Sequence, residues 1–180
     1  MWPAANSTGD WNTFMGTSAG EANTEGGSNT FIGIIAGQDN ETGDANTFLG
    51  AAAGRENVAS DSNTFVGDHA GFSNNGSGNT FLGAAAGYNN TTGQRNVFIG
   101  YRAGHNSVSE SNQLIIANGT QTSNVLIYGD FSSGNVGIGS TDPDARLEIQ
   151  GVSGGVALIK IDQRGASHYA GLRLDRDDNE

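Results

Sequence analysis

Histidine is the side chain in this sequence best suited to binding a transition metal, and three are present: His69, His105 and His168. Zinc sites place their histidine and cysteine ligands at short, regular spacings, and the sequence contains no cysteine. His69 and His105 occupy different positions within the repeat described below, and His168 stands alone. We therefore interpret all three as surface or turn residues and predict no metal site.

Carboxylates gather near the end of the sequence, where Asp175, Asp177, Asp178 and Glu180 offer the oxygen ligands that calcium prefers. They lack the glycine turn and the twelve-residue loop of a calcium-binding hand, so we interpret them as a solvated acidic segment. The glycine-rich string at residues 134–139 lies among short strand-like segments rather than before a helix, which argues against a dinucleotide-binding loop. We predict no catalytic residue and no cofactor, and we do not expect an enzyme.

Composition argues against several further classes of protein. The formal net charge is −11 and Lys160 is the only lysine, so no basic surface for nucleic acid or anionic membranes is expected. No apolar run reaches the roughly 18 residues of a membrane span. The first ten residues show no charged and apolar regions of a signal peptide. We expect no nucleic-acid partner and no membrane insertion in this segment.

An internal repeat dominates the sequence. Ala-Gly follows seven and eight residues after the start of each unit, and a degenerate seventh unit is assigned to begin at Asn112. Such repetition is typical of a solenoid, in which each coil covers its neighbour. The pattern Asn-Thr/Val-Phe-apolar-Gly recurs in steps of 17, 17, 17, 16 and 17 residues from Asn12, through Asn29, Asn46, Asn63 and Asn79, to Asn96.

Each unit predicts one short strand followed by a tight corner. The segment is too short for a helix, and the glycine four residues after the asparagine permits the positive φ of a sharp turn. The equivalent asparagines are expected to form a ladder of side-chain amides, and the polar stretch that follows is expected to be a solvent-facing loop. The fold class is therefore all-β, a parallel β-roll of about 17-residue coils. The turn glycines are Gly16, Gly33, Gly50, Gly67, Gly83 and Gly100.

The strands carry large apolar side chains on both faces, because each phenylalanine is followed directly by another apolar residue and adjacent strand residues point to opposite faces. One face fills the interior of the roll, and the other would be a bare stripe in a monomer, which predicts self-association. The alternative is a wide roll that partly encloses both residues. We predict that the phenylalanines form a stripe in the core or in the interface between chains: Phe14, Phe31, Phe48, Phe65, Phe81 and Phe98.

The repeat resembles the YadA-like head of trimeric autotransporter adhesins over residues 12–118. The resemblance implies a left-handed parallel β-roll and a homotrimeric fibre in which three rolls pack side by side. Aligning the Ile-Gly end of the strand implies that Thr30 and Ile32 point into the roll and that Phe31 faces a neighbouring chain. The sequence departs from the family by carrying phenylalanine where a small residue is usual, which implies wider spacing between the chains.

The segment after the repeats is similar to a connector found in phage tail fibres and bacterial surface fibres ahead of a tip domain. Within it, residues 135–139 and 147–149 are predicted strands. We divide the chain into an N-terminal lead-in (1–11), the β-roll (12–118), a β connector (119–151) and the start of a tip domain or an intertwined β-hairpin (152–180).

The resemblance implies a structural and adhesive fibre segment, extracellular on a cell surface or virion, that presents its C-terminal tip to glycans or proteins of a host, prey or other cell. Phe72 and Tyr88, nine residues after their asparagines, could either stack on sugars or pack the loops. The alternative function is that of an ice- or mineral-binding β-solenoid, which requires a flat threonine array facing water. The threonines at the start of the strands are expected to be internal, which disfavours it: Thr13, Thr30, Thr47, Thr64 and Thr80.

Overall fold

The computed structural model describes residues 8–120 and 125–151 of the chain. The described residues form ten β-strands and no helix, and all ten strands belong to one sheet in which each strand pairs with the next in sequence. Two compact units are distinguished, residues 1–150 and 151–180, and every strand lies in the first. The predicted tip segment, residues 152–180, lies outside the described residues.

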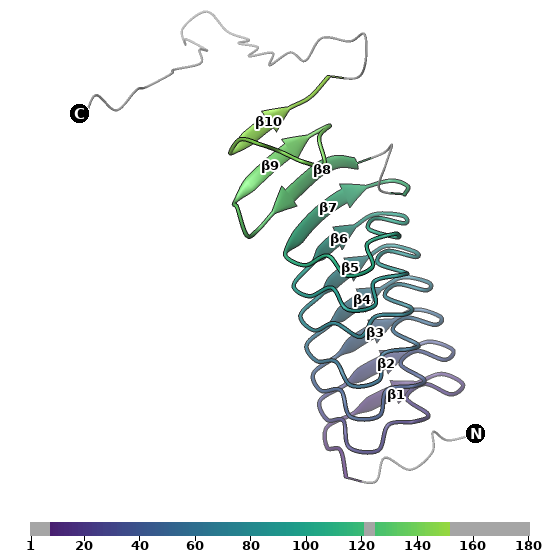
Figure 1. Cartoon of the computed structure of the whole chain (residues 1–180). Helices are drawn as coiled ribbons and strands as arrows, with labels where there is room; N and C mark the ends of the chain where they lie inside the picture. The colour runs from purple at the N-terminus through teal and green to yellow at the C-terminus, as the bar shows by residue number, and fades with distance from the viewer. Residues whose placement is uncertain (1–7, 121–124, 152–180) are drawn as a thin grey trace, which may run out of the picture. The chain divides into compact units, whose positions relative to one another are not determined.

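Seven parallel strands, one per coil, stack along a common axis (Figure 1). Six of them have three residues each, and the equivalent residues of neighbouring coils are paired, for example Phe31 with Phe48 and Thr30 with Thr47. The predicted β-solenoid of about 17-residue coils is therefore confirmed. The strands are β1 (Thr13–Met15), β2 (Thr30–Ile32), β3 (Thr47–Leu49), β4 (Thr64–Val66), β5 (Thr80–Leu82), β6 (Val97–Ile99) and β7 (Gln113–Ala117).

The seventh coil begins one residue later than predicted. Strand β7 pairs Leu114 with Val97 and Ile115 with Phe98, so Gln113 rather than Asn112 stands at the position of the repeated asparagine. Asn112 has a φ of 61°, the left-handed conformation that Arg95 adopts at the same point of the preceding coil. Glutamine satisfies the register because its backbone N–H can still bond to the coil below.

Three further strands extend the sheet beyond the coils: β8 (Val125–Asp130), β9 (Asn135–Ile138) and β10 (Leu147–Ile149). Strand β8 runs antiparallel to both β7 and β9, whereas β10 runs parallel to β9. Tyr128 of β8 packs against the hydrophobic core, and its hydroxyl accepts a hydrogen bond of 3.1 Å from Nε2 of Gln113. Burial raises the pKa of Tyr128, so the phenol stays neutral where it covers the last coil.

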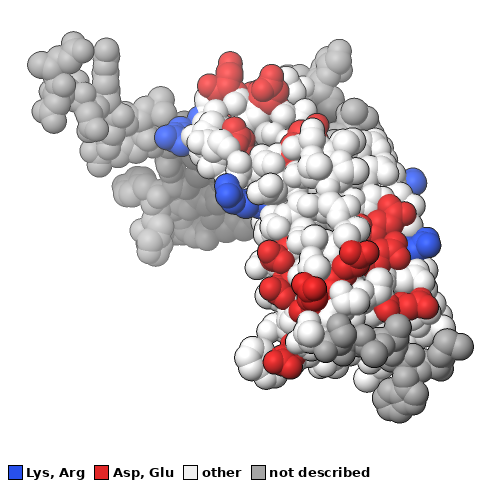
Figure 2. All heavy atoms as spheres, turned by 60° about the horizontal axis from the view of Figure 1, so that its bottom comes forward, with Lys and Arg blue, Asp and Glu red and all other residues white. Residues whose placement is uncertain are grey.

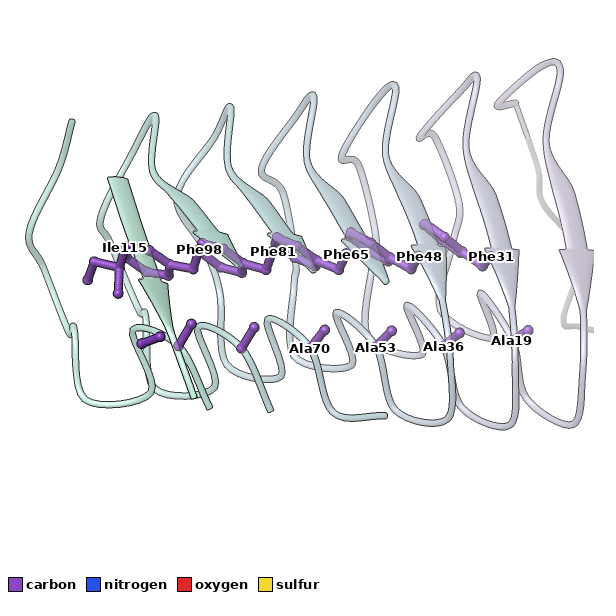
Figure 3. Packing of buried hydrophobic residues seen from close by; sticks show 13 residues of the cluster. Ala19, Phe31, Ala36, Phe48, Ala53, Phe65, Ala70, Phe81, Phe98 and Ile115 are labelled. Atoms are coloured by element: carbon purple, nitrogen blue, oxygen red, sulfur yellow. The ribbon is translucent and has the colours of Figure 1, made fainter. Parts of the chain in front are cut away.

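A column of stacked phenyl rings forms the core of the roll (Figure 3). Neighbouring rings have centroids 4.7–4.9 Å apart and interplanar angles of 4–10°. Phe14 is partly buried, whereas the other five phenylalanines are 0% exposed within their own chain. The alanine seven residues after each repeated asparagine lines the opposite wall, as Ala36 and Ala53 do.

The expectation that Phe31 faces a neighbouring chain is wrong. Of the two roles considered for the stripe, core and interface between chains, the structure places these side chains in the core: Phe14, Phe31, Phe48, Phe65, Phe81 and Phe98. The physical reason is the width of the coil. With alanine and glycine on the far wall, the interior has room for one large flat side chain per coil, and a buried ring removes the most apolar surface from water. The phenylalanines are core residues, and the residues beside them in each strand must face outward.

Glycine makes room for each ring. The glycine eight residues after the asparagine has a φ of 56–61°, and a Cβ on Gly71 would lie 2.5 Å from the ring of Phe65. The predicted turn glycines have φ values of 115–143°, and they also permit close stacking of the coils. A Cβ on Gly50, for example, would lie 2.6 Å from the carbonyl carbon of Gly67 in the next coil.

The repeated asparagines form the predicted ladder inside the coils. The backbone N–H of Asn46 donates to Oδ1 of Asn29 at 2.8 Å, and the N–H of Asn63 donates to Oδ1 of Asn46 at 2.9 Å. Nδ2 of the same side chain closes its own coil, as in the 2.8 Å bond from Asn46 to the carbonyl of Ser60. Each amide therefore joins the start of a strand both to the next coil and to the end of its own loop.

A second asparagine ladder lies in the stretch that we predicted to face solvent throughout. Its five members, eleven residues after the first ladder's asparagines, are at most 1% exposed. Nδ2 of Asn40 donates to Oδ1 of Asn23 at 3.0 Å, whereas Nδ2 of Asn57 and of Asn74 donate within the loops, to Ser60 and Gly76. The prediction was wrong for these positions because the loop folds back over its own amide groups. They are Asn23, Asn40, Asn57, Asn74 and Asn90.

One coil is a residue shorter than the others without any change in the strands. The two ladders are separated by five residues between Asn74 and Asn79, compared with six between Asn57 and Asn63. Thr64 nevertheless pairs with Thr80, and the N–H of Asn79 still donates to Oδ1 of Asn63 at 2.9 Å. The loop therefore absorbs the missing residue.

We expect Gly71→Ala to lower the free energy of unfolding by about 2–5 kcal/mol, because the new methyl group overlaps the Phe65 ring and the residue keeps a left-handed φ. Gly78→Ala is the matched control: Gly78 has a φ of 74°, but the nearest atom to its Cβ would be 3.6 Å away. Urea unfolding should show a loss of no more than about 1–2 kcal/mol for the control. Equal losses for the two variants would contradict the requirement for space beside the ring.

Candidate functional site

The outward face of the sheet carries a continuous column of apolar side chains, which we call the outer apolar column. It consists of the residue after each phenylalanine and its paired residues in β7–β10. Because the phenylalanine points inward, the residues on either side of it point outward. The column runs through Met15, Ile32, Leu49, Val66, Leu82, Ile99, Ile116, Ile127, Ile138 and Ile149.

None of these ten side chains is buried. Met15 is 63% exposed, Leu49 44%, Leu82 47% and Ile138 38%, and the others are half-buried. Paired residues on one face of a sheet lie close enough to touch, so the column is a strip without a gap. The expectation that Ile32 points into the roll is wrong, because a strand of three residues with phenylalanine inside leaves both its neighbours outside.

A second outer column lies two residues before the first in every strand except the antiparallel β8, where it lies two residues after it. This second column changes character along the sheet. In β1–β5 it is threonine, and the expectation that these threonines are internal is wrong: four are exposed and Thr30 is half-buried. From β6 onward it has no hydroxyl. Its members are Thr13, Thr30, Thr47, Thr64, Thr80, Val97, Leu114, Gly129, Val136 and Leu147.

Charge is distributed unevenly along the coils. Figure 2 shows many more acidic than basic side chains on the face in view. The threonine-bearing coils, residues 8–95, contain nine carboxylates and two arginines, a net charge of −7. The described residues from 96 onward contain five carboxylates and two arginines, a net charge of −3. The threonine-bearing coils therefore carry more net negative charge than the rest of the described chain.

A ladder of rings lies outside the roll at the ninth position after the repeated asparagine. Phe72 and Tyr88 stack with centroids 4.9 Å apart and an interplanar angle of 4°, and His105 stacks on Tyr88 at 5.2 Å. His69 lies against Phe72 at 5.4 Å although it comes from a turn at a different position in the repeat. The two histidines predicted to be surface or turn residues thus flank one aromatic ladder.

In the preceding coils, toward the N-terminus, polar side chains occupy the same position of the repeat and continue the ladder. The guanidinium carbon of Arg55 lies 5.5 Å from the centroid of the Phe72 ring, and Nε of Arg55 donates to Oε1 of Gln38 at 3.2 Å. Nε2 of Gln38 donates to Oε2 of Glu21 at 2.9 Å. This hydrogen bond, and a second from Ser18, lower the pKa of the Glu21 carboxyl.

These contacts decide between the two roles considered for Phe72 and Tyr88. A sugar that stacks on an aromatic residue covers a free ring face. Here one face of Phe72 meets Arg55 and the other meets Tyr88, while Tyr88 lies between Phe72 and His105. The ladder leaves ring edges rather than faces for a ligand, so the geometry supports packing between coils.

We expected the sequence to contain no Gly-x-Ser-x-Gly pattern of hydrolase nucleophiles, and this is wrong, because residues 16–20 match it. That pattern places serine between a strand and a helix, whereas the described residues contain no helix. Ser18 has a φ of 54° and bonds to Glu21, and the same turn position is occupied by Ile35 and Ala52 in the next coils. The match is a product of the repeated turn.

Within residues 8–120 and 125–151, no three histidine or acidic side chains are grouped closely enough to hold a metal ion. None of these residues belongs to a helix that is long and apolar enough to cross a membrane. The acidic segment ending in Glu180 and the residue His168 lie outside the described part of the chain. The outward face of the sheet is therefore the candidate functional site.

Comparisons with known proteins return no match. No family model, no curated protein and no solved structure matches the chain. The class of protein is defined by the fold alone, which is a β-solenoid extended by a three-stranded antiparallel and parallel segment.

Tyr88→Ala is expected to lower the free energy of unfolding by about 2 kcal/mol or more, because it removes ring contacts on both sides of the residue. The control is Tyr101→Ala, which changes a tyrosine that is 54% exposed and should cost less than about 0.5 kcal/mol. Urea unfolding measures both. Similar values for the two variants would show that the outer ladder does not bind the coils together.

Proposed function

We propose that this chain is a structural and adhesive fibre segment in which three copies of a left-handed β-roll associate side by side. The observation that supports this most strongly is the outer apolar column, whose ten side chains are all at least partly accessible in a single chain. A soluble monomer rarely exposes an apolar surface this continuous. Covering it with other copies removes that surface from water.

The shape of the column favours another copy of the chain as its partner. Ten strands, separated by nine intervals of about 4.8 Å, make a strip roughly 43 Å long and only one or two side chains wide. A globular partner offers a compact patch, which such a strip matches poorly. A second solenoid offers a strip of the same length and the same repeat. The resemblance to trimeric adhesin heads supports three copies rather than two.

In this proposal the roll is a rigid spacer on a cell surface or virion, and it has no catalytic role. Its tip, residues 152–180, recognises a glycan or protein on a host, prey or other cell. Two features support the division of labour. The coils of β1–β5 repeat the same strand chemistry with little variation, and both ring faces of Phe72 and of Tyr88 are covered by their neighbours. Specific recognition needs a more distinctive surface.

The association itself is tested by mass and by cross-linking. Light scattering at micromolar concentration should give about three times the chain mass of 18.5 kDa. Because the chain has no cysteine, Ile138→Cys in the column and Val58→Cys in a loop are clean single-thiol variants. They change residues of similar accessibility, 38% and 39% exposed. Mild oxidation or a short thiol cross-linker should join Ile138→Cys chains but not Val58→Cys chains.

A mass of 18.5 kDa for the unmodified protein would refute side-by-side association. Equal cross-linking of the two cysteine variants would mean that copies meet elsewhere than at the outer apolar column. Each of these outcomes is separate from the identity of the ligand at the tip.

The second candidate is an ice- or mineral-binding solenoid, and the exposed threonine column favours it. Five threonines face outward in register, as a flat array requires. The neighbouring column, however, mixes methionine, isoleucine, leucine and valine, whose unequal lengths make the face uneven. We regard this function as the weaker of the two.

A thermal-hysteresis assay discriminates between the candidates. Under the fibre proposal, the protein should show no gap between melting and freezing temperatures that exceeds that of an albumin solution at equal mass concentration. A clear gap that disappears in the variant Thr47→Lys would support the second candidate instead. Thr42→Lys, on an exposed loop position, is the control substitution.

A further inference from the structure

We infer that copies of the chain meet through the C-terminal half of the outward face, strands β6–β10, while the threonine-bearing strands β1–β5 remain hydrated. This inference rests on the proposed side-by-side association and specifies which part of the surface makes it. The partner is a second copy of the same chain.

The first argument is the chemistry of the two outer columns. In β6–β10 neither column contains a side-chain hydroxyl or a charge, and Leu147 is 57% and Ile138 38% exposed. The apolar surface there is two side chains wide in four of the five strands, and in β8 the buried Gly129 leaves only Ile127. In β1–β5 the same width is shared between one apolar side chain and one threonine per strand. Only the C-terminal half can be covered without removing water from polar groups.

The second argument is the hydrogen bonding of the threonines. Four of the five threonines at the start of β1–β5 are exposed and one is half-buried, and within the described residues their hydroxyls form no hydrogen bond, which leaves them free to bond to water: Thr13, Thr30, Thr47, Thr64 and Thr80. Burying a hydroxyl without a replacement bond is unfavourable, and the penalty would recur at every coil. A row of unbonded hydroxyls therefore opposes a dry contact along the N-terminal half.

The third argument is electrostatic. Copies packed side by side in the same direction place the net charge of −7 on the coils of β1–β5, residues 8–95, next to an equal charge on each neighbour. The described residues from 96 onward carry −3. Repulsion between like charges, screened by salt but present, adds to the hydration of the threonines. All three features change in the same direction along the sheet.

A matched pair of charge substitutions tests the inference. Ile138→Asp and Leu49→Asp both change the outer apolar column, at residues that are 38% and 44% exposed, in the C-terminal and N-terminal halves respectively. We expect Ile138→Asp to weaken association at least about a hundredfold, and Leu49→Asp to weaken it less than about tenfold. Sedimentation equilibrium over a concentration series measures the association constants, and circular dichroism melting checks that each chain is folded.

Ile138→Asp could also weaken association by unfolding β9 locally. A second variant, which makes the N-terminal half of the face more apolar, tests the inference without changing β9. Val97 shows that valine is accepted at the threonine position, so the isosteric double variant Thr47→Val and Thr64→Val should preserve the coil. If the threonine hydroxyls keep the outward face of β1–β5 hydrated, this variant should strengthen association by about tenfold or more. Unchanged or weaker association would overturn the role given to the hydroxyls.

The outcomes separate the two proposals. An unmodified protein that is monomeric overturns side-by-side association, and this inference with it. An unmodified trimer that is disrupted equally by both aspartate variants, or more by Leu49→Asp, leaves the fibre proposal intact and overturns the assignment of the contact to β6–β10.

Discussion

Hydrogen bonding by one buried asparagine per coil sets the register on which every other contact depends. Its Oδ1 accepts the backbone N–H of the asparagine one coil further on, and its Nδ2 donates to a carbonyl near the end of its own coil. A shift of one residue would break both bonds and leave a buried amide unpaired, at a cost of about 1–3 kcal/mol for each polar group. Because the penalty recurs in each coil, the stack resists slippage as a whole, and the sheet keeps identical residues side by side.

This register turns a one-dimensional repeat into columns with distinct chemistry. The inward column is a stack of phenyl rings, and it exists because glycine and alanine leave room on the far wall of the coil. Between the strands and the loops lie amide ladders, which satisfy the backbone where it turns. The outward columns are not required for the coil to close, so they are free to carry threonine in one half of the sheet and aliphatic residues in the other. We therefore look for function in the outward-facing side chains, which the coil does not need for its own packing.

The sequence was sufficient to predict the solenoid, the length of its coils, the strands and the first asparagine ladder, because each of these follows from spacing. It did not reveal which way Phe31 points: alternation within a three-residue strand is the same for either orientation, and only the room left by residues such as Gly37 decides it. The second ladder was missed because Asn40 stands in a polar loop. An asparagine nevertheless recurs eleven residues after the asparagines of the first ladder, as Asn40 does after Asn29. This recurrence was the available signal, because a loop that only faces solvent does not require the same residue at the same position in successive coils.

The short coil between Asn63 and Asn79 shows how such a molecule tolerates change. A residue is missing from the loop, yet the strand wall passes through this point with its pairing intact. Insertions and deletions are thus confined to one edge, while gain or loss of a complete repeat leaves each remaining coil with the same neighbours. The number of repeats then sets the length of the solenoid, because each coil adds about 4.8 Å. Recombination between near-identical repeats could lengthen or shorten the structure in those steps without inventing a new fold.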